Sequence, residues 1–206
     1  MRRLLPAMLV AVLLIVGTAD AREFGANLRR AADSSATCQT FIFYQPVPSC
    51  SWTTSGTIND ASETMLAPGN GRINRVRIKT GPVTGPMRVT VAEALRREDS
   101  GESACCTGRR QSRVFTPRRN AITRVNVNLP VRVSFNPVSR YYAYDVIFLT
   151  MQNANTPIPA SLGDQNTGNC SGGWFPAIRP RQENFSGPYG VCGYTILMRP
   201  NFVRRR

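Results

Sequence analysis

The 206-residue sequence contains no histidine, and this absence excludes several classes of function. Without an imidazole the chain has no Ser-His-Asp or Cys-His catalytic pair and no histidine ligand for a metal. Charged residues make up only 18% of the chain, which is too few for a coiled coil. Acidic residues are scarce as well, with 12 Asp and Glu against 26 Lys and Arg. The composition predicts no metal site and no cofactor.

Residues 1–21 have the organisation of a secretory signal peptide. Arg2 and Arg3 precede an apolar stretch over 4–16, and Ala19-Asp20-Ala21 supplies the small residues before a cleavage site. The apolar stretch is short for crossing about 30 Å of hydrocarbon, so export is favoured over a membrane anchor. No later segment is apolar enough to span a bilayer. The sequence therefore predicts a secreted, extracellular protein, with association at the cell surface as an option.

The six cysteines are even in number, as in a disulfide framework formed in an oxidising compartment. We predict pairing between sequence neighbours, namely Cys38–Cys50, Cys170–Cys192 and Cys105–Cys106. Adjacent Cα atoms lie only about 3.8 Å apart across a trans peptide, below the usual disulfide distance. The alternative therefore joins Cys105 and Cys106 to two different partners. A zinc site is a poor third option, because CxxC spacing and histidine are both missing.

The rest of the chain is typical of strands separated by Gly, Pro and Asn turns. Hydrophobic and polar residues alternate over 71–80, 87–91, 122–129 and 193–199. The run 141–151 is continuously apolar, as in a strand buried on both faces or deep within a sandwich, and 100–108 is expected to be a polar loop. These patterns predict an all-β fold, an antiparallel β-sandwich or jelly roll stapled by disulfides.

The predicted organisation has three parts. A signal peptide over 1–21 is followed by a partly ordered N-terminal arm over 22–37. Residues 38–206 form a single β-sandwich domain with a long loop region around 152–192.

Four motifs within residues 70–160 carry a resemblance to a known group of proteins. They are GRINRVRIKTG, GPMRVTVAEAL, SRVFTPRRNAITRVNVNLPV and YDVIFLTMQ, followed by Pro157-Ile158-Pro159. This stretch resembles secreted β-sandwich proteins common in actinobacteria, in which a T-x-V-x-V-x-L-P-V strand recurs. The resemblance implies an extracellular β-sandwich and assigns no catalytic residue.

Arginines on the polar side of the strands form a predicted basic face. Its members are Arg75, Arg77, Lys79, Arg88 and Arg124. Further arginines lie outside this set, at 109, 110, 118, 119 and 132. The formal charge of +14 falls to +13 on export, because two arginines and one aspartate leave with the signal peptide. Such a surface attracts polyanions, although the usual nucleic-acid motifs are missing; the alternative is an arginine-rich solvated face.

The segment 170–192, bounded by two cysteines, is the second candidate site. It combines Trp174, Phe175 and Tyr189 with Arg179 and Arg181. Aromatic side chains on a stapled loop suit stacking on sugar rings or contact with a protein, and the arginines suit acidic groups. The alternative is that Trp174 and Phe175 cap the core.

Glu93 and Asp145 fall within predicted strands, but no motif marks them as a catalytic pair. We therefore predict a non-enzymatic binding protein for carbohydrate or an anionic envelope polymer. One alternative is a small secreted hydrolase that uses these acidic residues, and another is a structural protein of the cell surface.

Overall fold

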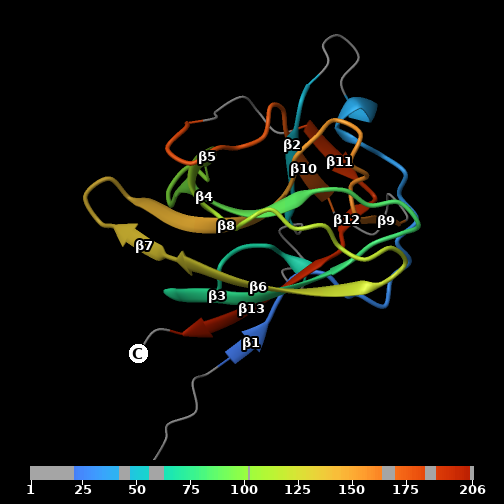
Figure 1. Cartoon of the computed structure of the whole chain (residues 1–206). Helices are drawn as coiled ribbons and strands as arrows, with labels where there is room; N and C mark the ends of the chain where they lie inside the picture. The colour runs from blue at the N-terminus through green and yellow to red at the C-terminus, as the bar shows by residue number, and fades with distance from the viewer. Residues whose placement is uncertain are drawn as a thin grey trace, which may run out of the picture.

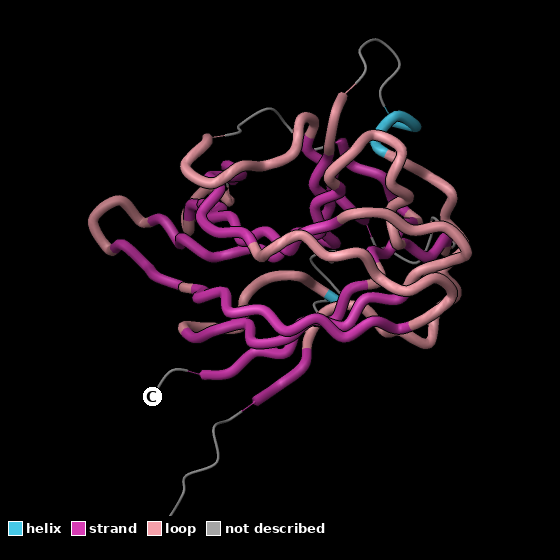
Figure 2. The backbone as a smooth tube through the Cα atoms, viewed as in Figure 1, coloured by secondary structure: helices cyan, strands magenta, loops and turns pink. Residues whose placement is uncertain are grey.

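The computed structural model describes residues 21–41, 47–55, 63–101, 103–163, 170–183 and 189–204, and it confirms the all-β fold. Two antiparallel sheets pack face to face, with the described strands in two layers (Figures 1 and 2). Residues 1–20 of the predicted signal peptide lie outside the described residues. No helix in the described ranges is long and apolar enough to cross a membrane.

The smaller sheet has four strands in the order β1–β13–β3–β6. Their bounds are β1 Ala21–Glu23, β13 Met198–Arg204, β3 Gly71–Lys79 and β6 Ile122–Val131. The larger sheet has the order β11–β10–β2–β8–β4–β5, and β7 also pairs with β8. Their bounds are β11 Tyr189–Cys192, β10 Cys170–Trp174, β2 Cys50–Ser55, β8 Tyr141–Met151, β4 Met87–Arg97, β5 Ser103–Gln111 and β7 Val133–Asn136. Outside the two sheets, β9 (Ala160–Leu162) pairs with β12 (Tyr194–Ile196), and η1 (Cys38–Phe41) is a 3₁₀ turn.

Alternation along the strands builds the core between the sheets, because every second side chain points to the same face. Val76 and Ile78 of β3 are fully buried, and so are Val89 and Val91 of β4. The apolar run of β8 is buried on both faces. Its side chains alternate between the main core and a second cluster on the outer face of the larger sheet. That second cluster contains Ala92, Ala94, Cys106, Val146, Phe148, Trp174 and Ile178.

The segment predicted as an N-terminal arm is part of the sandwich. β1 pairs with β13, and the backbone N–H of Ala26 donates to the carbonyl of Met198 at 3.0 Å. Ala26 is fully buried, and Leu28 and Ala36 also belong to the main core. The sequence offered little indication that this segment is ordered, because only isolated apolar residues of the segment enter the core.

Strands also occupy parts of the stretch predicted as a long loop region, since β9, β10 and β11 all fall within 152–192. Strand β10 was not predicted because it contains two glycines, and glycine has low β-propensity. A Cβ at Gly173 would lie 2.6 Å from an indole carbon of Trp52 on the paired strand. Glycine is therefore required for the close approach of a fully buried tryptophan.

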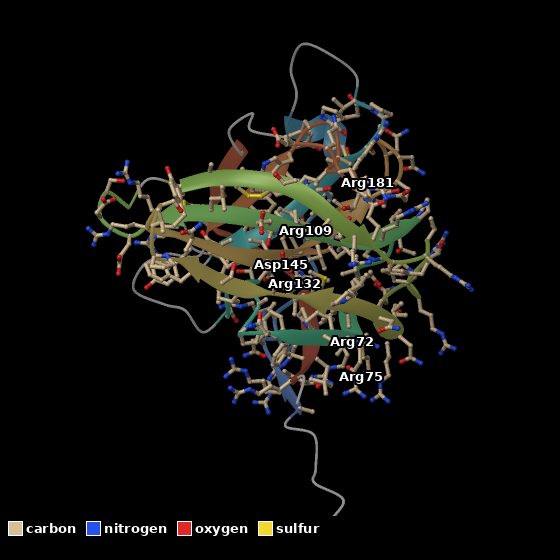
Figure 3. The ribbon with its side chains drawn as sticks, turned by 90° about the vertical axis from the view of Figure 1, so that its left-hand side faces the viewer. Arg72, Arg75, Arg109, Arg132, Asp145 and Arg181 are labelled. Carbon is tan, nitrogen blue, oxygen red and sulfur yellow. A yellow bond between two sulfur atoms is a disulfide. The ribbon has the colours of Figure 1, made fainter. Side chains whose placement is uncertain are left out.

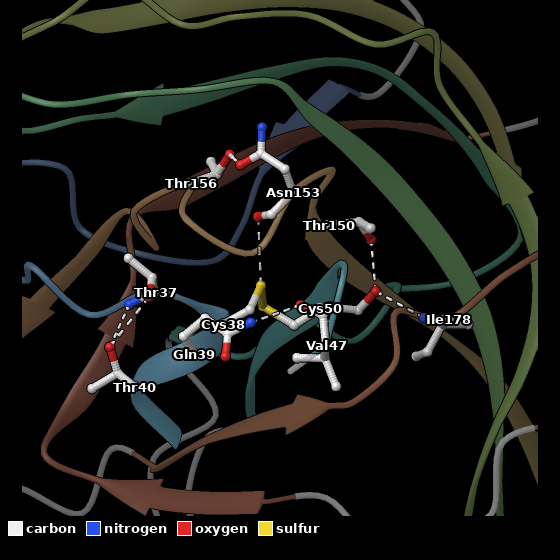
Figure 4. The surroundings of a disulfide bond; sticks show 11 residues. Thr37, Cys38, Gln39, Thr40, Val47, Cys50, Thr150, Asn153, Thr156 and Ile178 are labelled. Atoms are coloured by element: carbon white, nitrogen blue, oxygen red, sulfur yellow. Dashed lines mark hydrogen bonds between the residues drawn. A yellow bond between two sulfur atoms is a disulfide. The ribbon is translucent and has the colours of Figure 1, made fainter. Parts of the chain in front are cut away.

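The predicted disulfides Cys38–Cys50 and Cys170–Cys192 are confirmed. Cys38–Cys50 is fully buried and joins η1 to β2, with its Cα atoms 5.6 Å apart (Figure 4). Cys170 and Cys192 face each other across β10 and β11. The structure also joins Cys105 to Cys106, within β5. All three bonds link the sequence neighbours that were expected.

Candidate anion-binding site

A buried carboxylate marks the place where the chain crosses from one sheet to the other. β6 ends at Val131 in the smaller sheet and β7 begins at Val133 in the larger one, so Arg132 lies at the crossover. Asp145 of β8, only 2% exposed, accepts a hydrogen bond from the backbone N–H of Arg132 at 2.7 Å. The backbone N–H of Asp145 donates in turn to the carbonyl of Arg132 at 3.0 Å. Asp145 therefore fixes the backbone of Arg132 at the point where the chain passes between the two sheets.

A second carboxylate lies beside it, because Glu93 of β4 faces Asp145 directly in the strand pairing. The guanidinium of Arg109 interacts with both carboxylates. It forms an ion pair with Glu93, and its Nε lies 3.5 Å from Oδ1 of Asp145. The larger sheet thus brings together the two acidic residues of the predicted hydrolase alternative, bridged by an arginine.

A β-bulge explains how Arg109 reaches this position. Val91 pairs with Arg110 and Ala92 pairs with Gly108, so Arg109 is the extra residue on β5. Bulges re-aim side chains and break the simple alternation of a strand. A second irregularity follows between Glu93 and Ala94. These interruptions explain why 100–108 was predicted to be a loop, whereas β5 in fact begins at residue 103.

Burial raises the pKa of Asp145 to about 6. The hydrogen bond from the Arg132 backbone and the positive charge of Arg109 oppose this change, whereas the negative charge of Glu93 adds to the rise in pKa. Desolvation of the charged form dominates because the side chain is almost completely enclosed. Asp145 therefore changes its charge near pH 6.

Replacing Asp145 with asparagine should change the pH dependence of stability. The pKa of Asp145 in the folded protein lies above its ordinary value of 3.8, so its ionisation destabilises the folded state by about 3 kcal/mol. The neutral carboxyl group of Asp145 favours the folded state. This stabilisation is complete below the ordinary pKa of 3.8 and is lost as the pH rises through about 6. The free energy of unfolding of Asp145→Asn relative to the wild type should therefore rise by about 3 kcal/mol between about pH 3.5 and pH 7. Urea unfolding at both pH values measures this difference, and a pH-independent difference would contradict the assignment.

Four arginines line a cavity of about 290 Å³ beside Asp145. They are Arg109, Arg110, Arg132 and Arg181. Among the described residues, none of Arg110, Arg132 and Arg181 forms an ion pair with a carboxylate. Planar guanidinium groups bind carboxylate, sulfate and phosphate groups through paired hydrogen bonds. The cavity is therefore suited to an anionic group.

Arg181 reaches the cavity because the segment after β10 folds back onto β5. Its backbone N–H donates to the carbonyl of Gly108 at 2.7 Å, and the N–H of Gly108 donates to the carbonyl of Gln182 at 3.0 Å. Arg181 has a positive φ of 64°, a conformation that non-glycine residues seldom adopt. This fold-back separates the two arginines predicted for the aromatic segment, because Arg179 lines a different cavity beside Arg88.

The predicted basic face is divided between the two sheets. Arg75, Arg77, Lys79 and Arg124 belong to β3 and β6 of the smaller sheet, whereas Arg88 belongs to β4 of the larger one. Arg88 donates to Oε1 of Gln111, at 3.5 Å. The five residues therefore do not form one continuous surface, because consecutive strands of this chain enter different sheets.

Glu23 of β1 neutralises part of the charge on the smaller sheet. Its carboxylate lies 3.7 Å from Arg75 and 3.2 Å from Arg199, and it also pairs with Arg77. An N-terminal segment predicted to be only partly ordered thus supplies the counter-ion for three arginines. Polyanion binding through this face would have to compete with Glu23, which makes the cavity at the crossover the better candidate.

The predicted aromatic site is largely occupied by packing. Trp174 is 4% exposed and packs edge-on against Phe148, with ring centroids 5.0 Å apart. Phe175 is half-buried and packs edge-on against Trp52 at 5.7 Å. The side chain of Tyr189 lies outside the described residues. Trp174 and Phe175 therefore contribute to the core, which is the alternative that the sequence left open.

The chain matches no protein-family model, and the searches of curated proteins and of solved structures found no match either.

Proposed function

We propose that the protein binds an anionic polymer, such as an acidic polysaccharide of a cell envelope, outside the cytoplasm. The observation that carries this proposal is the cavity at the crossover. Arg110, Arg132 and Arg181 converge there, and none of the three forms an ion pair with a carboxylate of the described residues. The signal-peptide pattern of residues 1–21 and the disulfides support an extracellular location. The proposed mode of action is binding without catalysis.

The arrangement of further arginines favours a polymer over a small anion. Figure 3 shows Arg181, Arg109, Arg132, Arg72 and Arg75 in succession down one side of the molecule. Arg72 of β3 pairs with Pro130, which itself lines the cavity, so this exposed arginine continues the positive surface onto the smaller sheet. A chain with repeated negative charges could contact several of these guanidinium groups at once, which raises the apparent affinity.

The test removes the unpaired arginines and keeps the ion-paired one. The triple variant Arg110→Gln, Arg132→Gln, Arg181→Gln should bind polygalacturonate at least about tenfold more weakly than the wild type at low salt. The slope of log K against log salt should also become shallower by about 2. Titration calorimetry over a range of salt concentrations measures both quantities, with neutral dextran as the uncharged comparison.

The matched control is Arg113→Gln, Arg118→Gln, Arg119→Gln, which removes the same charge from exposed positions outside the cavity. Arg118 and Arg119 precede β6, near the end of the smaller sheet farthest from Arg132. The control should retain most of the affinity. Equal losses in the two triple variants would overturn the proposal and leave only non-specific attraction to a basic protein.

A second candidate function, glycan hydrolysis, rests on the facing carboxylates. A carboxyl group with a pKa of about 6 can donate a proton near neutral pH, and Asp145 borders a cavity. Hydrolysis predicts turnover on a glycan panel that Glu93→Gln abolishes while polygalacturonate binding persists. Binding without turnover favours the non-enzymatic function, and absence of both favours a structural protein.

A further inference from the structure

A second cavity, of about 400 Å³, lies over β2, β4, β5, β8, β10 and β11 of the larger sheet and shares no lining residue with the arginine cavity. We propose that it binds a small, uncharged, mostly apolar molecule that carries one hydrogen-bond acceptor such as a carbonyl oxygen. The lining residues that bear on this proposal are Thr53, Cys105, Tyr144, Cys170, Trp174 and Gly190.

The lining contains no charged residue, although the chain has 26 Lys and Arg. Burying an ionised ligand group here would cost free energy that no charged lining residue would offset. Burial also raises the pKa of the Tyr144 phenol, which keeps this group neutral. The ligand is therefore uncharged, in contrast to the polyanion proposed for the crossover.

Trp174 is a lining residue that carries a polar group without a partner among the described residues. Its indole is held edge-on against Phe148, and its buried Nε1–H has no acceptor among the described residues. A buried donor without a partner is costly, so a ligand that brings an acceptor to Nε1 gains affinity and orientation. The hydroxyl of Thr53 cannot act as the donor instead, because it already donates to the carbonyl of Ile147 at 2.8 Å.

The walls of the cavity are formed before any ligand binds. Cys105 and Cys170 belong to two different disulfides, and the other lining residues come mainly from paired strands. A volume of about 400 Å³ is near the lower end of the range for small-molecule sites. Little ordering is needed on binding, which favours affinity for a compact ligand.

Gly190 provides a way to fill the cavity without disturbing the fold. A Cβ built at this position has no heavy atom within 4 Å, whereas one at Gly173 would meet the Trp52 ring at 2.6 Å. Gly190→Leu should therefore occupy the cavity with its side chain, and Gly190→Ala should leave most of the volume open. Trp174→Phe keeps an aromatic ring at the position that packs on Phe148 and removes the N–H donor together with the pyrrole part of the indole.

The experiment uses prodan, an uncharged naphthyl ketone whose emission depends on polarity. We expect saturable binding with a blue-shifted emission, and a titrating shift of the Trp174 Nε1–H resonance in ¹⁵N-edited NMR spectra. Trp52 does not line the cavity, so its indole resonance is the internal reference. Trp174→Phe should weaken binding about tenfold, Gly190→Leu should weaken it by more, and Gly190→Ala should retain it.

Two results would overturn the proposal. The first is the absence of saturable binding with an unmoved Trp174 resonance, as expected if water alone satisfies the indole N–H. The second is equal prodan affinity in Gly190→Leu and the wild type, provided that both show the same urea unfolding midpoint. The triple arginine variant of the crossover cavity should bind prodan normally, so this test is independent of polyanion binding.

Discussion

Gly108→Ala is expected to lower the free energy of unfolding by about 5 kcal/mol and to detach residues 175–183 from β5. A Cβ at this position would overlap the carbonyl oxygen of Arg179 and would lie 3.0 Å from a side-chain carbon of Ile178. Both contacts are too short, and the first is with backbone, which cannot rotate away as a flexible side chain can. Either the segment or the strand must move.

The expected size of the effect follows from what the segment buries. Ile178 is fully buried in the outer cluster, and its burial contributes about 1.5–3 kcal/mol. Two backbone hydrogen bonds join the segment to Gly108, and Nε2 of Gln111 donates to the carbonyl of Ile178 at 2.9 Å. Each such bond is worth about 1 kcal/mol. Loss of the docked segment would also remove Arg181 from the anion-binding cavity.

Urea unfolding and limited proteolysis test this prediction together. The variant should unfold at a lower urea concentration and should be cleaved by trypsin after Arg181, because the bond after Arg179 precedes Pro180 and resists trypsin. Its polygalacturonate affinity should also fall. Gly190→Ala is the matched control, since open space surrounds that position. A stable, protease-resistant Gly108→Ala protein would show that the segment is not held as described.

The second large effect concerns the disulfides. Removing Cys38–Cys50 with a double alanine substitution should cost about 5 kcal/mol, against about 3 kcal/mol for removing Cys170–Cys192. In the chain-entropy model the two bonds constrain the unfolded chain to a similar extent, because they close loops with sequence separations of 12 and 22. Both sulfurs of Cys38–Cys50 lie in the main core, and their loss adds a cavity.

The surroundings of Cys38–Cys50 reinforce this expectation. The disulfide sulfur of Cys38 lies 4.0 Å from the carbonyl oxygen of Asn153. The side-chain amide of Gln39 donates to the carbonyl of Val47 at 3.1 Å (Figure 4). Cys192, in contrast, is exposed. Denaturant unfolding of the two double variants under oxidising conditions measures the two costs. The reverse order of stability would show that burial of the sulfurs contributes little.

Much of the fold was accessible from the sequence. The alternation through Val76 and Ile78 and the continuous apolar run of β8 identified strands, because local side-chain spacing reports which faces are buried. The disulfides were predictable because each cysteine pairs with its neighbour in the sequence. Strand β10 was not predictable, since its Gly173 is explained only by the Trp52 indole packed beside it.

The candidate sites depended on contacts between distant residues. Arg109 reaches Asp145 through a bulge, and Arg132 reaches it at a crossover between sheets. Arg181 joins them through a segment that folds back over Gly108. None of these relations leaves a spacing pattern, because strand pairing brings together residues that are far apart in the chain.

The sequence by itself determined the absence of imidazole chemistry, the excess of positive charge and the strand-rich architecture. These properties follow from composition and from local periodicity, which need no knowledge of the partner strand. The tertiary structure alone decided which arginines converge without an ion-pair partner among the described residues, and that Glu23 neutralises three others. It also decided that Trp174 is buried beside a cavity with an indole N–H that no described residue accepts. The reason is physical: charge and exposure are set by neighbours in space, and the sheet register chooses those neighbours.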